Sequence, residues 1–209
     1  MKRLQNRVIQ HLQGSWWVYI FLGICFTAGI IFGALGVNIM DDQQTSSLRQ
    51  FLDEGFSQFE YNLNFMATTQ QAISKNLVNL GKIFLLGLTV IGFPLILVII
   101  FTRGFVLGFT VFFLIKEKAL WGALIALLAV FPPNFLSLPA YILAAAAAIN
   151  FSLYLLRTKT TPIANYALSY LLLMITLAVL MLGAALIEGY LSPLFIQLLS
   201  FSLWESFVS

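Results

Sequence analysis

Few residues in this chain have side chains that could do chemistry. His11 is the only histidine and Cys25 the only cysteine, so the sequence offers no His/Cys metal cluster, no Ser-His-Asp arrangement and no H-E-x-x-H helix. Every aspartate lies between 41 and 53, which leaves none to form the intramembrane pair that an aspartyl protease needs. The carboxylate that calls for an explanation is Glu188, which interrupts the apolar run "MLGAALIEGYLSPLF". We expect no catalytic residue, no cofactor, no metal and therefore no enzyme.

The elements that would position Glu188 are membrane helices. The chain has 209 residues, of which 60% are hydrophobic and only 9% are charged. A water-soluble core of this length requires no such excess, so an integral membrane protein is predicted. The net charge of +3 does not indicate a nucleic-acid partner, because the basic residues are scattered among apolar runs and form no patch.

Hydropathy predicts a single all-α membrane domain, 1–209, made of a polytopic helix bundle. We expect about five transmembrane helices, one re-entrant or broken helix and an extracytoplasmic amphipathic helix. The predicted segments are a cytoplasmic N-terminus (1–15), spans at 16–40, 83–102, 119–136, 139–156 and 165–187, an extracytoplasmic segment (41–82), a re-entrant segment (104–115) and an outer interfacial helix (193–207).

Segment 41–82 is the only long polar stretch. Within it, apolar side chains recur at three- and four-residue steps between 48 and 66, Phe51 and Phe59 among them, which is typical of an amphipathic helix. Ser47 and Gln50 offer a capping box at its start. Two interpretations remain open: a connector that covers the bundle or dips into lipid headgroups, and a docking surface for another protein.

The short apolar pieces between Arg103 and Pro133 are the reason for predicting a re-entrant segment. Each is too short to cross a bilayer alone. With a cytoplasmic N-terminus, this map places eight of the eleven basic residues inside, including Lys116 and Lys118, as the positive-inside rule favours.

Two interpretations of Glu188 remain open. The helix predicted before it is longer than a hydrocarbon core of about 30 Å, so Glu188 could lie at the outer interface, with Ser192 and Pro193 starting a new helix. Alternatively, its carboxylate faces a groove in the bundle and pairs with a basic group or a partner chain.

Two G-x-x-x-G patterns, Gly29 with Gly33 and Gly104 with Gly108, are typical of close helix packing. Packing within one chain is favoured over a homodimer face, which stays an alternative. A transporter or permease that uses the broken helix 104–131 is the alternative function.

Four stretches carry a resemblance: "YIFLGICFTAGIIFGALGVN", "FTRGFVLGF", "FPPNFLSLPAYILAAAAAI" and "AALIEGYLSP". Their order and spacing over nearly the whole chain resemble the stage II sporulation protein M family, and its sporulation branch in particular. The wider family often has a histidine-glycine after the central proline and a glutamate a few residues on. Here Pro133 is followed by Asn134, and position 138 is leucine, so no role of those polar groups carries over.

The resemblance implies a non-enzymatic protein of the mother-cell membrane that acts during forespore engulfment. It would localise and hold stage II sporulation proteins D and P, whose extracytoplasmic domains cut peptidoglycan. The hypothesis from the residues is a scaffold that binds a membrane anchor of a partner, in contact with membrane lipids, with Glu188 and the 48–66 stripe as outer contacts and an extracytoplasmic C-terminus.

Overall fold

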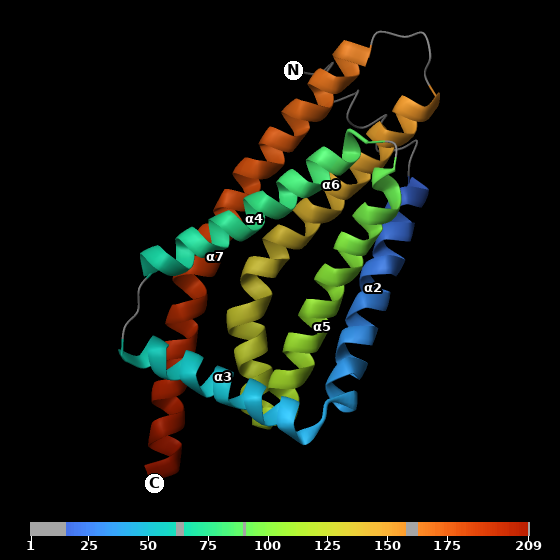
Figure 1. Ribbon diagram of the computed structural model, residues 1–209. Coiled ribbons are helices and arrows are strands. Elements are labelled where there is room, and N and C mark those ends of the chain that lie inside the picture. Colours follow the sequence, from blue (N-terminus) through green and yellow to red (C-terminus); the bar gives the residue numbers. More distant parts are fainter. Residues whose placement is uncertain (1–15, 62–64, 90, 158–162, 209) are drawn as a thin grey trace.

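The protein is an elongated bundle of helices (Figure 1). The computed structural model describes all residues except 1–15, 62–64, 90, 158–162 and 209, and the predicted cytoplasmic N-terminus lies outside the described residues. Its elements are the α-helices α2 (Trp16–Ile39), α3 (Asp42–Tyr61), α4 (Phe65–Gly87), α5 (Gly92–Ile125), α6 (Phe131–Arg157) and α7 (Ile163–Val208), with a π-helical turn η1 (Ala126–Val130) between α5 and α6. The prediction of an all-α fold is confirmed for these residues.

Three stretches are long and apolar enough to cross a membrane, namely 16–39, 92–156 and 166–191. The second holds 65 residues and is folded into two antiparallel arms. They meet at Ala119, where φ is 48° and the helical path reverses. Gly122 permits this hairpin, because a Cβ there would lie 3.0 Å from the nitrogen of Ile115 and closer still to the carbonyl of Leu114.

Contacts between distant residues give the direction of each helix. Near the start of both helices, Sγ of Cys25 in α2 donates to the carbonyl of Leu97 in α5. Further along both, Nζ of Lys116 in α5 donates to the carbonyl of Val37 in α2, so these two helices run parallel. The carbonyl of Thr89, just after α4, accepts a hydrogen bond from Ser152, which sets α4 alongside α6 in the same direction. The chain therefore runs one way in α2, α5 and α7, and the opposite way in α4 and α6 (Figure 1).

The core is built around α6. Its alanine run, predicted to mark close helix approach, is almost fully buried: Ala144, Ala145, Ala146 and Ala148 are each 0% exposed. A Cβ on Gly87 of α4 would lie 2.9 Å from the Cα of Ala148. Tyr170 of α7 stacks on Phe151 with ring centroids 4.6 Å apart and donates a hydrogen bond to the carbonyl of Phe84. These contacts join α4, α6 and α7 into one layer.

The predicted boundary at Arg103 is wrong. A single helix, α5, starts at Gly92 and continues through Arg103, so 83–102 is not one span and 104–115 is not a separate short helix. The break lies earlier, at 88–91, where Gly92 donates to the carbonyl of Thr89. Pro94 sits in the first turn of α5, where its missing N–H costs no helical hydrogen bond, and "GFP" thus marks a helix start.

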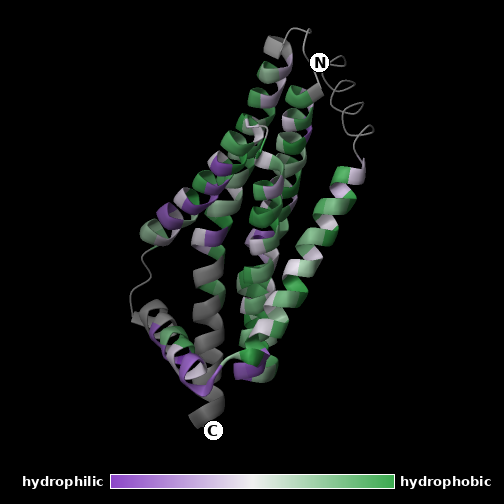
Figure 2. Ribbon diagram, turned by 45° about the vertical axis from the view of Figure 1, so that its right-hand side comes forward, coloured by the Kyte–Doolittle hydropathy of each residue, from purple (hydrophilic) through white to green (hydrophobic). Residues whose placement is uncertain are grey.

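The predicted second crossing is replaced by α4. This helix buries Thr69, Ala72, Asn76, Leu80 and Ile83 at three- and four-residue steps, while hydrophilic residues recur along its other side (Figure 2). Because of this polar side, the first 18 of its 23 residues do not form an apolar run long enough to predict a span, and they fall in the predicted extracytoplasmic segment 41–82.

Two further predicted breaks are absent. Segments 119–136 and 139–156 are not two spans, because η1 and α6 continue through the prolines. Helix α7 likewise continues past Glu188 to Val208, so no new helix begins at Pro193. The side chains of Ser192 and Pro193 lie outside the described ones.

Helix α3 begins earlier than predicted. Asp41 is its N-cap residue, and the N–H of Asp41 donates to Oε1 of Gln44, the reciprocal half of a capping box. Ser47, the predicted cap, instead donates to the carbonyl of Gln43 inside the helix.

Candidate functional site

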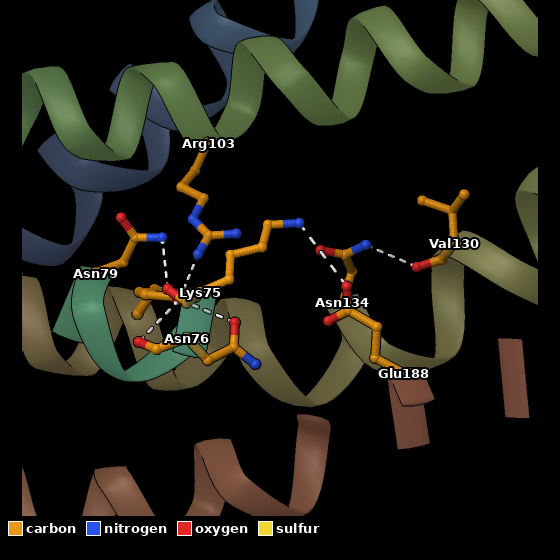
Figure 3. Close-up of polar contacts among 8 residues, drawn as sticks. Lys75, Asn76, Asn79, Arg103, Val130, Asn134 and Glu188 are labelled. Atoms are coloured by element: carbon orange, nitrogen blue, oxygen red, sulfur yellow. Dashed lines mark hydrogen bonds and ion pairs between the residues drawn. The ribbon is translucent and has the colours of Figure 1, made fainter. Parts of the chain in front are cut away.

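A cluster of polar side chains lies where α4, α5, α6 and α7 meet and runs from the buried Tyr141 and Asn76 to the exposed Lys75 (Figure 3). Arg103 of α5 is its centre. From Gly92 to Arg103 the helix rises about 17 Å, and from Arg103 to Lys118 about 22 Å, so Arg103 lies near the middle of this arm. The hydropathy pattern predicts the end of a span at Arg103, whereas the Arg103 side chain is half-buried in the bundle.

Tyr141 of α6 fixes the Arg103 guanidinium in two ways. The Tyr141 hydroxyl accepts a hydrogen bond from Nη2, and the guanidinium carbon lies 4.1 Å from the Tyr141 ring centroid. Such cation–π contact strengthens when the pair is removed from water. Since Tyr141 is only 1% exposed, the guanidinium is held in one orientation.

Asn76 of α4 completes the link. The Tyr141 hydroxyl donates to Oδ1 of Asn76 over 3.1 Å, so three helices are joined by the chain Arg103, Tyr141, Asn76. Asn76 is 2% exposed and its Nδ2 has no hydrogen-bond partner, as is also true of Oγ1 of Thr69, two turns earlier on the same face of α4. Unsatisfied buried groups of this kind carry a free-energy cost of about 1–3 kcal/mol each.

Glu188 of α7 belongs to the same cluster. Its Oε1 lies 3.8 Å from Nζ of Lys75, and the two side chains are 32% and 58% exposed. Lys75 precedes Asn76, so Glu188 lies beside the mid-bundle cluster (Figure 3). The predicted helix end at Glu188 is wrong, because α7 continues past it. Glu188 is paired with a basic group, Lys75, as the alternative interpretation expects.

Pro133 is buried in the first turn of α6, directly after the π turn η1. Pro132 and Pro133 have no N–H groups to donate to the carbonyls of the preceding turn. The side chain of Asn134 donates from Nδ2 to the carbonyl of Val130 over 2.7 Å. Figure 3 places the Asn134 amide beside Lys75 and Glu188.

The glycine patterns pack against each other within the chain. A Cβ on Gly29 or Gly33 would lie within 3.0 Å of the α5 backbone, and a Cβ on Gly104 or Gly108 would collide with the α2 backbone. Both patterns are thus used where α2 and α5 cross, and the prediction of packing within one chain is confirmed.

Helix α3 lies across one end of the bundle, next to the α5 hairpin (Figure 1). Arg49 forms an ion pair with Glu117, whose side chain is only 6% exposed, and Leu52 packs against the buried cluster around Leu114 and Ile125. Phe51 is 69% exposed, and the side chain of Phe59 lies outside the described ones. An open pocket of about 720 Å³ borders α3, lined by Met40, Asp41, Gln43, Gln44, Ser47, Leu48, Phe51 and Phe109.

The ends of the helices also correct the predicted sides of the membrane. Nζ of Lys116 donates to the carbonyl of Val37, so the "KEK" segment lies at the same end as the start of α3. The prediction that these two segments lie on opposite sides of the membrane is therefore wrong.

Sequence reasoning found Arg103 and Glu188 but missed Lys75, Asn76 and Tyr141. The signal was present in "SKNLVNLGK", where polar residues recur within a helix and one of them, Asn76, is buried together with Leu80. The cluster as a whole carries two cations and one carboxylate and has more donors than acceptors, so it is suited to binding an anionic group. Among the residues described, no group of three or more His, Cys, Asp or Glu side chains could hold a metal ion.

Comparison with known proteins gives one family. The model of the family "Stage II sporulation protein M" matches residues 22–193, which include most of α2 and every residue of the polar cluster. No curated protein and no solved structure matches. This family is not known as a family of enzymes. The chain therefore belongs to the stage II sporulation protein M family and is a sporulation-related, multi-pass membrane protein.

Proposed function

We propose that the protein is a non-enzymatic membrane scaffold that recruits peptidoglycan-degrading proteins, stage II sporulation proteins D and P, and holds them together during forespore engulfment. Membership of the family supports the sporulation role. The observation that carries the scaffold role is α3, a polar helix that covers the end of the bundle and leaves an aromatic side chain exposed beside an open pocket.

The topology that fits this role has a cytoplasmic N-terminus and five alternating crossings, α2, α4, α5, α6 and α7. At the end where α2 begins and α6 ends, Lys2, Arg3, Arg7, Arg157 and Lys159 occur in the sequence without any acidic residue. At the α3 end the basic residues are fewer, namely Arg49, Lys116 and Lys118. The positive-inside rule therefore assigns α3 to the extracytoplasmic side. The exposed Trp16 and Trp17 then lie in the aromatic belt at the cytoplasmic interface.

On that side, α3 is both anchored and available. The Arg49–Glu117 ion pair and the packing of Leu52 fix it to the hairpin, so its exposed residues are presented rigidly. A fixed surface loses less conformational entropy on binding than a flexible one. Phe51 is an aromatic anchor of the kind that dominates binding interfaces.

The test is co-purification of the two hydrolases from sporulating cells. Phe51→Glu places a charge beside the pocket and is expected to reduce recovery of both hydrolases at least tenfold. Ser46→Glu is the matched control, because Ser46 is an exposed residue of the same helix that does not line the pocket. Equal recovery with Phe51→Glu, Ser46→Glu and the unchanged protein would refute α3 as the recruiting surface. Failure of the unchanged protein to recover either hydrolase would refute the scaffold function.

A further inference from the structure

The outer side of α4 carries a stripe that alternates cationic and apolar side chains. Lys75, Val78, Lys82 and Leu85 follow one another at three- and four-residue steps and are all exposed. Arg103 of the neighbouring α5 points toward the Lys75 end of this stripe (Figure 3). We call Lys75, Lys82 and Arg103 together the basic face.

The basic face has more positive than negative charge beside it. Glu188 lies 3.8 Å from Lys75, but no carboxylate of the described residues forms an ion pair with Lys82 or Arg103. The Tyr141 hydroxyl takes one N–H of Arg103, which leaves the other guanidinium donors available. Cations inside a membrane bundle are costly and normally pair with an acidic group, so the face is incomplete in the isolated chain.

The depth of Arg103 in the membrane restricts which anionic group can pair with the basic face. Arg103 is about 17 Å along α5 from Gly92 and about 22 Å from Lys118, whereas lipid phosphates lie at the edges of a hydrocarbon core of about 30 Å. A phosphate would have to be drawn about 15 Å inward. A carboxylate on a transmembrane helix can be at that depth without any deformation of the bilayer, and Val78 and Leu85 offer apolar surface for such a helix.

We propose that the basic face is the docking site for a transmembrane helix of a partner protein, and that a carboxylate near the middle of that helix pairs with Arg103. This inference rests on the proposed scaffold function and adds the membrane-embedded chemistry that selects the partner. Tyr141 acts as a positioning residue, because it orients the guanidinium before the partner arrives.

The test uses the full chain in phosphatidylcholine nanodiscs at pH 8 and a synthetic leucine-alanine transmembrane peptide with one central glutamate. A second peptide with glutamine at that place is the comparison. Binding is measured by energy transfer to a dye on the hairpin. We expect the glutamate peptide to bind at least tenfold more tightly than the glutamine peptide. Arg103→Gln is expected to abolish the preference, and Arg103→Lys to retain most of it.

Lys116→Gln is the matched control, because Lys116 is exposed and lies at the α3 end of the bundle; it should keep the full preference. If Arg103→Gln does not fold, Lys82→Gln on the exposed face is expected to weaken the preference by at least threefold. Equal affinity of both peptides for the unchanged protein overturns the proposal. A lipid result would also overturn the proposal. It requires that the unchanged protein retains phosphatidylglycerol, that Arg103→Gln does not, and that adding this lipid removes the peptide preference. Those results together would assign the basic face to a lipid headgroup.

The two proposals fail separately. If the hydrolases co-purify but the peptide preference is absent, only the role of the basic face is wrong. If the preference is present but neither hydrolase is recovered, the recruitment of these hydrolases is wrong and the charge-selective docking site stands.

Discussion

Gly33→Ala should destabilise the bundle even though alanine is a better helix former than glycine. A Cβ on Gly33 would lie 2.8 Å from the nitrogen of Phe109 and closer still to the carbonyl of Phe105. A carbon–oxygen contact normally needs about 3.3 Å, so α2 and α5 must move apart by about 1 Å. Overpacking of this kind costs about 1–3 kcal/mol. The gain from helix propensity is at most about 1 kcal/mol, so a net loss of about 1–2 kcal/mol is expected.

Gly23→Ala is the matched control in the same helix. No atom lies within 4 Å of a Cβ built on Gly23, so this change adds helix propensity without a clash. We expect its stability to be unchanged or to rise by up to about 1 kcal/mol. The free energy of unfolding is measured by titrating the purified protein from mild detergent into dodecyl sulfate and following tryptophan fluorescence.

A double variant sharpens the test. A Cβ on Gly108 would lie 2.7 Å from the Cα of Ile30 in the same crossing. One separation of the helices relieves both clashes, so Gly33→Ala with Gly108→Ala should cost less than the sum of the two single changes. If Gly33→Ala is as stable as Gly23→Ala, α2 and α5 do not pack through these glycines, and the reasoning about the crossing is refuted.

Three further results are expected. Tyr141→Phe leaves Oδ1 of Asn76 and one Arg103 donor without their partner, so unfolding should become easier by about 1–3 kcal/mol, and an unchanged dodecyl sulfate midpoint would contradict this. A double-mutant cycle of Lys75→Met and Glu188→Gln should give a coupling below about 1 kcal/mol, because the 3.8 Å pair is partly exposed; several kcal/mol would show a closer pair. In a cysteine-free background, an impermeant thiol reagent on intact cells should label Leu120→Cys at the hairpin but not Leu88→Cys at the opposite end, and the reverse pattern would invert the proposed topology.

The features that the sequence predicted well depend on local patterns. Apolar length identified α2 and α7, and the spacing of Gly29 with Gly33 and Gly104 with Gly108 identified a close crossing. Both signals rest on neighbouring residues of one helix, so they can be read without knowing which helices meet.

The features that it predicted wrongly depend on partners far away in the chain. Arg103 was read as an interfacial stop because an isolated cation in a span is costly. Tyr141, 38 residues further on, supplies the ring and hydroxyl that make it tolerable inside the bundle. Similarly, charge counting predicts Lys116 and segment 41–82 on opposite sides of the membrane, whereas Nζ of Lys116 donates to the carbonyl of Val37, at the end where α3 starts.

Helix α4, which takes the place of the predicted span 83–102, links the wrong predictions to the proposed function. A helix with Lys75 and Lys82 on one side fails any hydropathy threshold, yet its other side is buried against α6 and α7 through residues such as Ile83 and Leu80. Hydrophobic residues at positions 75 and 82 would lower the free energy of inserting α4 into a bilayer, so the two lysines make insertion of α4 by itself less favourable. Their cost falls when a carboxylate lies beside them, as Glu188 does beside Lys75. The stability of α4 in the bundle and the occupancy of the basic face by an acidic partner are thus expected to be coupled, with each favouring the other.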